Sequence, residues 1–90
     1  MIIYARTQDK SKILKIEGMD YEQKRTVKKT VYGGNVTEEI VETKHNLVWA
    51  RRFLGEYATK ERCLEVMTQF QTAIDNKSTD STLVFNMPER

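Results

Sequence analysis

Two adjacent glycines, Gly33 and Gly34, separate two long β-prone segments and constrain the fold of this chain more than any other feature. The segments cover residues 21–32 and 35–43 and are rich in valine, threonine and tyrosine or isoleucine. A two-residue type I′ turn needs a positive φ at both central residues, which glycine adopts without steric cost. The pattern therefore predicts a long β-hairpin that turns at the two glycines.

A two-residue turn also fixes the register of this hairpin. The aliphatic pairs are then Val31 with Val36 and Val27 with Ile40, and Thr26 faces Val41. The opposite-charge pairs are Lys29 with Glu38, Lys28 with Glu39, and Arg25 with Glu42. Each cross-strand pair of these kinds contributes roughly 0.2–1 kcal/mol. A three-residue loop would place Lys24 opposite Lys44, so the two-residue turn is favoured.

The hairpin carries a cationic run over residues 24–29 that is typical of a phosphate-binding stripe. The predicted partners of this run include the carboxylates of Glu38, Glu39 and Glu42. Because these carboxylates would neutralise the cations, a solvated and self-neutralised ribbon is the favoured interpretation. A module that binds nucleic acid through the run is the alternative, although the net charge of the chain is only +2.

An amphipathic helix is predicted over residues 59–76. Thr59 is a suitable N-cap, Glu61 lies near the positive end of the helix dipole, and Asn76 is the expected left-handed terminator. Apolar residues recur at three- and four-residue spacing along one face, namely Cys63, Val66, Met67, Phe70, Ala73 and Ile74, with Leu64 widening the stripe. We expect this face to pack on the core; an oligomer interface would use the same residue types.

The other β-prone segments cover residues 1–6, 12–16, 47–54 and 82–87, and turns are predicted at 7–10 and 44–46. Segment 47–54 has apolar residues on both sides, which favours a central strand, and the strand after the helix is expected to return to the sheet. The predicted fold is α+β: a mainly antiparallel sheet of five to six strands packed by one helix over about 59–76. Residues 1–90 are expected to form a single domain.

Cysteine content and hydropathy suggest the cellular setting. The one cysteine, Cys63, excludes an internal disulfide, and its place on the apolar stripe predicts a buried, reduced thiol. No segment approaches the roughly 20 consecutive apolar residues of a membrane helix, and no signal-peptide pattern opens the chain. We therefore expect a cytoplasmic protein without membrane association.

The segment Leu54-Gly55-Glu56-Tyr57-x-Thr59-x-Glu61-Arg62-x-x-Glu65-Val66-Met67, with Phe85-x-Met87-Pro88 further on, resembles a set of small uncharacterised proteins from Firmicutes, their phages and other mobile elements. The resemblance is good over residues 53–67 and moderate in the tail. It implies a β-rich N-terminal half followed by one helix and a short tail. It implies no particular chemistry, and the Gly33-Gly34 hairpin is longer here than in that pattern.

The residues that would carry catalysis are sparse. No phosphate-binding loop is present, because the two glycines are not followed by Lys-Ser/Thr and a helix. One histidine and one cysteine are too few for a zinc site of the Cys/His type. His45 lies in a polar segment and is interpreted as a solvated side chain. We therefore expect no enzymatic activity, no metal and no cofactor.

Trp49, Arg51 and Arg52 form the cluster most suggestive of binding. An aromatic face can stack on a ring, and a guanidinium can hold a phosphate through two parallel hydrogen bonds. The predicted ligand-binding residues are Trp49, Arg51, Arg52, Lys28, Lys29 and Tyr57, brought together in a homo-oligomer. The alternative is that Trp49 belongs to the core and the arginines only flank it.

These patterns favour a small non-enzymatic binding protein of phage or mobile-element type. It would hold an anionic small ligand such as a nucleotide between subunits and act as a decoy for a host signal. The alternative is a protein–protein inhibitor or adaptor that acts on a host protein through a sheet edge or the helix face. A nucleic-acid-binding module that uses residues 24–29 is a third hypothesis.

Overall fold

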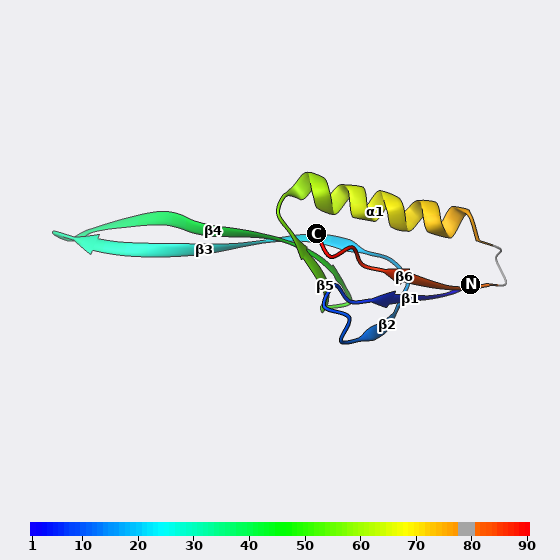
Figure 1. The fold of residues 1–90 in the computed structure, drawn as a ribbon. Coiled ribbons are helices and arrows are strands. Elements are labelled where there is room, and N and C mark those ends of the chain that lie inside the picture. The colour runs from blue at the N-terminus through cyan, green and yellow to red at the C-terminus, as the bar shows by residue number, and fades with distance from the viewer. Residues whose placement is uncertain (78–80) are drawn as a thin grey trace.

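The computed structural model describes residues 1–77 and 81–90 and has one helix and two three-stranded sheets (Figure 1). The elements are β1 (Ile2–Arg6), β2 (Ile13–Ile16), β3 (Asp20–Tyr32), β4 (Asn35–Trp49), β5 (Arg52–Tyr57), α1 (Lys60–Asp75) and β6 (Thr82–Asn86). The predicted α+β class with one helix is confirmed. The expectation of one continuous sheet is wrong, since the outer edge of β5 is met by the side chain of Gln8 instead of another strand.

The first sheet has the strand order β2-β1-β6. Strand β1 is antiparallel to β2, with Ile3 opposite Ile16, and parallel to β6, with Ile3 opposite Leu83. The strand that follows the helix therefore returns to the sheet, as expected. In β2 and β6, buried or half-buried residues alternate with exposed ones. The residues of this sheet that pack into or against the core cluster are Ile3, Ala5, Leu14, Ile16 and Phe85.

The second sheet has the order β3-β4-β5 and contains the predicted hairpin. Gly33 and Gly34 have φ values of 57° and 85°, and the register follows the prediction from the tip as far as the pair Val27–Ile40. Beyond that pair β4 has one extra residue, so Thr26 faces Glu42.

The pairings predicted for Thr26 with Val41 and for Arg25 with Glu42 are therefore wrong, and Arg25 faces Thr43. The extra residue is a β-bulge that reverses the inward and outward alternation of β4. As a result Leu47 lies opposite Tyr21 and is fully buried. An unbroken register would have put Asn46 in that core position.

The predicted turn at residues 44–46 is also wrong, because β4 runs through it. Residues 44–46 are polar and have polar neighbours on adjacent strands. The Tyr21 hydroxyl forms a hydrogen bond with Nδ1 of His45, at 2.7 Å. The predicted strand 47–54 is instead divided by a tight turn at Ala50 and Arg51, whose φ values are 50° and 66°. Strand β5 then returns antiparallel to β4.

Helix α1 begins as predicted. The Thr59 hydroxyl oxygen accepts a hydrogen bond from the Arg62 N–H at 3.1 Å. The helix ends at Asn76 with a right-handed φ of −89°, so the expected left-handed terminator is wrong. Leu64 is 45% exposed and does not pack with the core cluster, so the prediction that it widens the apolar stripe is wrong.

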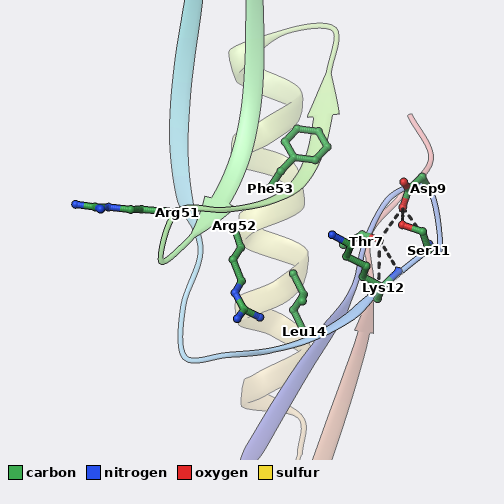
Figure 2. A pocket seen from close by; sticks show the side chains of 8 residues that line it. All are labelled: Thr7, Asp9, Ser11, Lys12, Leu14, Arg51, Arg52 and Phe53. Atoms are coloured by element: carbon green, nitrogen blue, oxygen red, sulfur yellow. Dashed lines mark hydrogen bonds between the residues drawn. The ribbon is translucent and has the colours of Figure 1, made fainter.

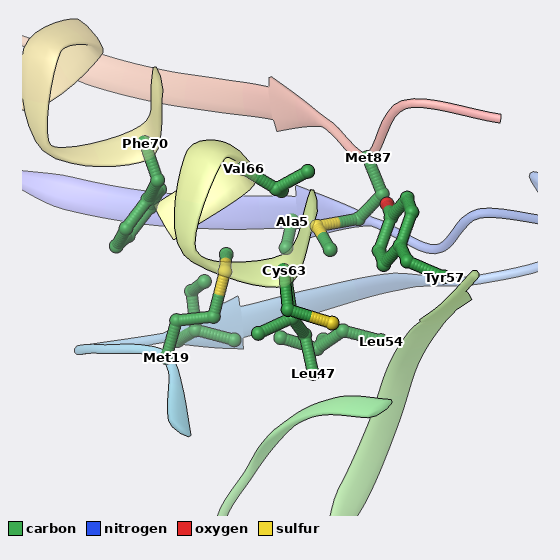
Figure 3. Close-up of a cluster of buried hydrophobic side chains, with 10 residues drawn as sticks. Ala5, Met19, Leu47, Leu54, Tyr57, Cys63, Val66, Phe70 and Met87 are labelled. Atoms are coloured by element: carbon green, nitrogen blue, oxygen red, sulfur yellow. The ribbon is translucent and has the colours of Figure 1, made fainter. Parts of the chain in front are cut away.

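The core lies between α1 and the two sheets (Figure 3). Its fully buried side chains include Leu47, Leu54, Cys63 and Val66. Cys63 is a free, buried thiol, as predicted, and burial raises its pKa. Within the described residues, no helix has the length and apolar character needed to cross a membrane.

The outer part of the β3–β4 hairpin, residues 22–43, projects from this body as an isolated two-stranded ribbon (Figure 1). We refer to it as the arm. Every residue of the arm is exposed, and the molecule measures 65 × 22 × 19 Å as a result. The arm thus includes nearly a quarter of the chain and makes no contribution to the core.

Candidate binding groove

An open groove of about 560 Å³ lies between the β1–β2 loop and the β4–β5 turn (Figure 2). Its lining residues are Thr7, Asp9, Ser11, Lys12, Leu14, Arg51, Arg52 and Phe53. Two of them, Arg51 and Arg52, belong to the cluster predicted from the sequence. The other six come from the facing loop and strand and from the start of β5.

The loop wall is organised around the carboxylate of Asp9. Its Oδ1 accepts hydrogen bonds from the Thr7 hydroxyl at 2.7 Å and from the Ser11 N–H and hydroxyl at 3.0 and 2.7 Å. These donors, the Ser11 N–H first, lower the pKa of Asp9 to about 2. The Asp9 side chain is thus ionised and held within its own loop.

The same loop is tied to the C-terminal tail. The Lys10 Nζ lies 2.9 Å from Oε1 of Glu89, and this contact lowers the pKa of the Glu89 carboxyl. The Thr7 N–H also donates to the Lys12 carbonyl oxygen at 2.9 Å. The position of Lys12 on the groove wall is therefore set by main-chain as well as side-chain contacts.

The turn wall is the tight β4–β5 turn, closed by the pair Trp49–Arg52. Ala50 and Arg51 both adopt the left-handed conformation, which costs roughly 1–2 kcal/mol for a residue other than glycine. Figure 2 shows the Arg52 side chain extending along the groove toward Leu14, whereas Arg51 points away from the groove. Arg52 is consequently the arginine best placed to meet a bound molecule.

The groove has an excess of positive charge. Arg52 and Lys12 accompany a single lining carboxylate, Asp9, and Arg51 is a further lining residue whose side chain points away from the groove. None of these three cations takes part in a salt bridge within residues 1–77 and 81–90. Phe53, which is 51% exposed, and the half-buried Leu14 add apolar surface to the lining of the groove. This combination is suited to an anion that also has a flat apolar part.

Trp49 does not belong to the groove. It is half-buried and packs against the core cluster. The ring also lies directly against Gly18, where an added Cβ would be only 2.8 Å from Cζ3 of Trp49. The arrangement corresponds to the alternative interpretation, in which Trp49 is a core residue and the arginines flank it.

The remaining predicted ligand-binding residues lie elsewhere. Tyr57 is 4% exposed, and its hydroxyl donates to the Pro88 carbonyl oxygen at 2.8 Å. Lys28 and Lys29 are on the arm, where Lys28 faces Glu39 and Lys29 Nζ is 3.7 Å from Glu38 Oε1. The structure therefore does not bring Trp49, Tyr57, Lys28 or Lys29 into one site with the two arginines.

Sequence reasoning missed Lys12, Phe53, Thr7 and Ser11. The spacing Thr7-x-Asp9-x-Ser11 is a local signal for a turn closed by side-chain hydrogen bonds. No local signal shows that this turn faces the β4–β5 turn, because the two are about 40 residues apart and meet only through the arrangement of the two sheets.

Neither a protein-family model, nor a curated protein, nor a solved structure matches this chain. The resemblance of residues 53–67 to small proteins of phages and mobile elements therefore stays an expectation. Over the part of the chain that the structure describes, no three His, Cys, Asp or Glu side chains are grouped so that they could hold a metal ion.

Proposed function

We propose that this protein is a small non-enzymatic binding protein that takes an anionic, nucleotide-like ligand in the groove. One observation carries the proposal: Arg52 and Lys12 line facing walls of the groove, which Phe53 also lines, and no salt bridge within the described residues engages either cation. The guanidinium of Arg52 would hold a phosphate through two parallel hydrogen bonds. Lys12 would add a point charge from the opposite side.

The size and lining of the groove support a ligand of this class. Small-molecule sites occupy roughly 300–1,000 Å³, and the groove volume of about 560 Å³ falls within that range. The exposed ring of Phe53 offers a stacking surface for a base, and such stacking is worth about 1–3 kcal/mol. The hydroxyls of Thr7 and Ser11 are already engaged with Asp9, so the cations supply most of the polar recognition.

A binding role, as opposed to catalysis, is supported by the state of the groove carboxylate. A general base works best when its pKa lies near the operating pH. Asp9 has a pKa of about 2, and its Oδ1 accepts hydrogen bonds from Thr7 and Ser11, so it is a weak proton acceptor. The proposed biological role, withholding a host signal nucleotide in a phage or mobile-element setting, rests on the sequence resemblance alone.

Isothermal titration with inorganic pyrophosphate and with linear and cyclic nucleotides tests this proposal. Arg52→Ala and Lys12→Ala should each weaken binding roughly tenfold or more, which corresponds to about 1.4 kcal/mol. Lys15→Ala is the matched control, because Lys15 is an exposed lysine on β2 outside the groove. Absence of binding to every one of these anions, or equal affinities for the Lys12 and Lys15 variants, would overturn the proposal.

A further inference from the structure

Among the described residues that line the groove, Asp9 alone is acidic, and the cations around it do not explain its place there. Lys12, Arg51 and Arg52 line the same groove. Within residues 1–77 and 81–90, the Asp9 carboxylate forms no salt bridge with any of the three. A carboxylate also repels an anionic ligand. Asp9 therefore either serves only its own loop or makes a contact with the ligand that offsets this repulsion.

The two oxygens of the Asp9 carboxylate have different surroundings. Oδ1 accepts hydrogen bonds from the Thr7 hydroxyl and from the N–H and hydroxyl of Ser11, at 2.7, 3.0 and 2.7 Å. Over the part of the chain that the structure describes, Oδ2 accepts no hydrogen bond from another residue. An ionised carboxylate has roughly four lone-pair sites, shared between its two oxygens. Oδ1 thus closes the loop, and Oδ2 keeps its capacity to accept a bond from a ligand.

The loop holds this carboxylate in place before any ligand arrives. The Thr7 hydroxyl that donates to Asp9 also accepts from the Lys12 N–H at 3.2 Å. The Lys10 N–H donates to the Thr7 carbonyl oxygen at 2.8 Å, and the Lys10 Nζ pairs with Glu89 at 2.9 Å. An acceptor that is already ordered loses little conformational entropy on binding. Oδ2 of Asp9 is therefore a preorganised acceptor on the same loop as Lys12.

The charge of Asp9 determines which ligand groups it can meet. The hydrogen bonds from Ser11 and Thr7 lower its pKa to about 2, so the side chain is ionised at neutral pH. An ionised carboxylate only accepts hydrogen bonds, and it therefore cannot donate to a phosphate oxygen. A hydroxyl group that donates to a carboxylate forms a charge-assisted bond, which is about twice as strong as a neutral one. The ligand group at Oδ2 must accordingly be a donor.

The order of groups in a nucleotide indicates which donor this is, because the sugar lies between the phosphate and the base. Lys12, which would contact the phosphate, is linked to Asp9 through the Thr7 hydroxyl. Phe53, which would stack on the base, belongs to the start of β5 on the other side of the groove (Figure 2). The sugar is thus the group that adjoins Asp9. A guanine edge would instead present two parallel N–H donors, which need both carboxylate oxygens.

We propose that the groove selects ribonucleotides, and that Oδ2 of Asp9 is the acceptor that recognises a ribose hydroxyl. The inference rests on the proposed function, since it names the class of nucleotide that the same groove takes. Acidic side chains recognise ribose hydroxyls in this way in dinucleotide-binding folds. A site built to bond a hydroxyl group rejects the analogue that lacks it. Without the hydroxyl, nothing offsets the repulsion between Asp9 and the phosphate.

Isothermal titration with adenosine 5′-diphosphate and its 2′,3′-dideoxy analogue tests the inference on the wild-type chain. The two ligands have the same phosphates and the same base, so the ratio of their affinities reports the sugar hydroxyls. We expect the ribonucleotide to bind roughly tenfold or more tightly than the analogue. Equal affinities would overturn the inference and leave the proposed function in place. Absence of binding to both nucleotides and to inorganic pyrophosphate would overturn the two together.

Asp9→Asn assigns the preference to this side chain. The asparagine Oδ1 can keep the three hydrogen bonds that close the loop, while an uncharged NH₂ group takes the position of Oδ2. We expect the affinity ratio to fall roughly fivefold, because a neutral bond to the hydroxyl is weaker than a charge-assisted one. The dideoxy analogue should bind more tightly than to wild type, because the repulsion is gone. An unchanged ratio would mean that Asp9 only closes its loop, and would overturn the inference.

Asp75→Asn is the matched control. Asp75 is an exposed acid at the end of α1, outside the groove, so its variant removes the same charge elsewhere. This variant should leave both affinities unchanged. An equal fall of the ratio in the Asp9 and Asp75 variants would contradict a local role for Asp9. The wild-type comparison of the two nucleotides involves no substitution, so it stays decisive even if Asp9→Asn disturbs the loop.

Discussion

The side-chain amide of Gln8 forms two hydrogen bonds with the main chain of Glu56. Its Nε2 donates to the Glu56 carbonyl oxygen at 2.7 Å, and its Oε1 accepts from the Glu56 N–H at 2.8 Å. The Gln8 N–H also donates to the Leu54 carbonyl oxygen at 2.9 Å. The same Nε2 is 2.9 Å from the Glu89 carbonyl oxygen. Gln8, which follows β1 in the chain, therefore takes the place of a neighbouring strand along β5 and joins the two sheets.

Removal of this amide should destabilise the protein as a whole. Gln8→Ala leaves the N–H and C=O of Glu56 without their partner, and we expect a loss of about 1–2 kcal/mol in the free energy of unfolding. Gln8→Glu should also destabilise, because a carboxylate cannot donate to the Glu56 carbonyl. The measurement is urea denaturation, with Gln69→Ala on the exposed side of α1 as the control. A shared midpoint for the Gln8 and Gln69 alanine variants would contradict this role.

The β4–β5 turn should be stabilised by residues that prefer its conformation. Ala50 and Arg51 have positive φ, and Asn-Gly is the preferred pair for such a type I′ turn. The double variant Ala50→Asn/Arg51→Gly should therefore raise the free energy of unfolding by about 1–2 kcal/mol. Arg51 points away from the groove, so the variant should keep most of its anion affinity, unlike Arg52→Ala. A destabilised double variant would show that the turn is held by other contacts.

A methyl group at Gly18 should disturb Trp49. The new Cβ would be 2.8 Å from Cζ3 of the ring, closer than van der Waals contact allows. Overpacking of this kind costs about 1–3 kcal/mol, so Gly18→Ala should lower stability and change the emission of the one tryptophan. In a Trp49→Phe background the same change should cost less, because the smaller ring leaves space. Equal costs in both backgrounds would show that the two residues are not coupled.

Tyr57 should make the protein less stable in alkali. Burial raises its pKa to about 12, whereas an unfolded tyrosine titrates near pH 10. The folded state thus favours the protonated phenol; its stabilising contribution is complete below about pH 10 and is lost as pH rises toward 12. Tyr57→Phe should reduce this loss, and should cost about 1 kcal/mol at neutral pH because the bond to Pro88 disappears.

Urea denaturation at a series of alkaline pH values measures this effect. Tyr32→Phe is the control, because Tyr32 is 84% exposed at the tip of the arm. Burial also raises the pKa of Tyr21, but Tyr21 is present in both variants and in the wild type. If Tyr57→Phe and wild type lost stability in parallel between about pH 10 and pH 12, Tyr57 would not be the residue responsible.

Features with a local cause could be predicted from the sequence. Gly33-Gly34 supplies both positive φ values of its turn, and Thr59 supplies the hydrogen bond that starts α1. The bulge after Ile40 could not be predicted in this way. The bulge places Leu47, and not Asn46, in the core beneath α1. This packing depends on residues far along the chain. The turn at Ala50 and Arg51 was missed because neither residue is a usual turn former.

The same distinction applies to the candidate site. Arg51 and Arg52 are adjacent in sequence, so their proximity was foreseeable, whereas their position at the β4–β5 turn was not. Trp49 and Tyr57 looked suitable for ligand stacking by residue type, but their burial depends on Gly18 and on the C-terminal tail. Lys12 reaches the groove only because β1 and β2 place their loop opposite the β4–β5 turn.

The parallel pairing of β1 with β6 affects when the protein can fold during synthesis. Strand β1 leaves the ribosome well before β6, and Ile3 pairs with Leu83. Contacts between residues so far apart in sequence slow folding. The nascent chain can form the β3–β4 hairpin before β6 is made, but the first sheet stays incomplete until β6 has left the ribosome. The exposed aliphatic residues of the arm are thus presented to neighbouring nascent chains on a polysome before the body has closed.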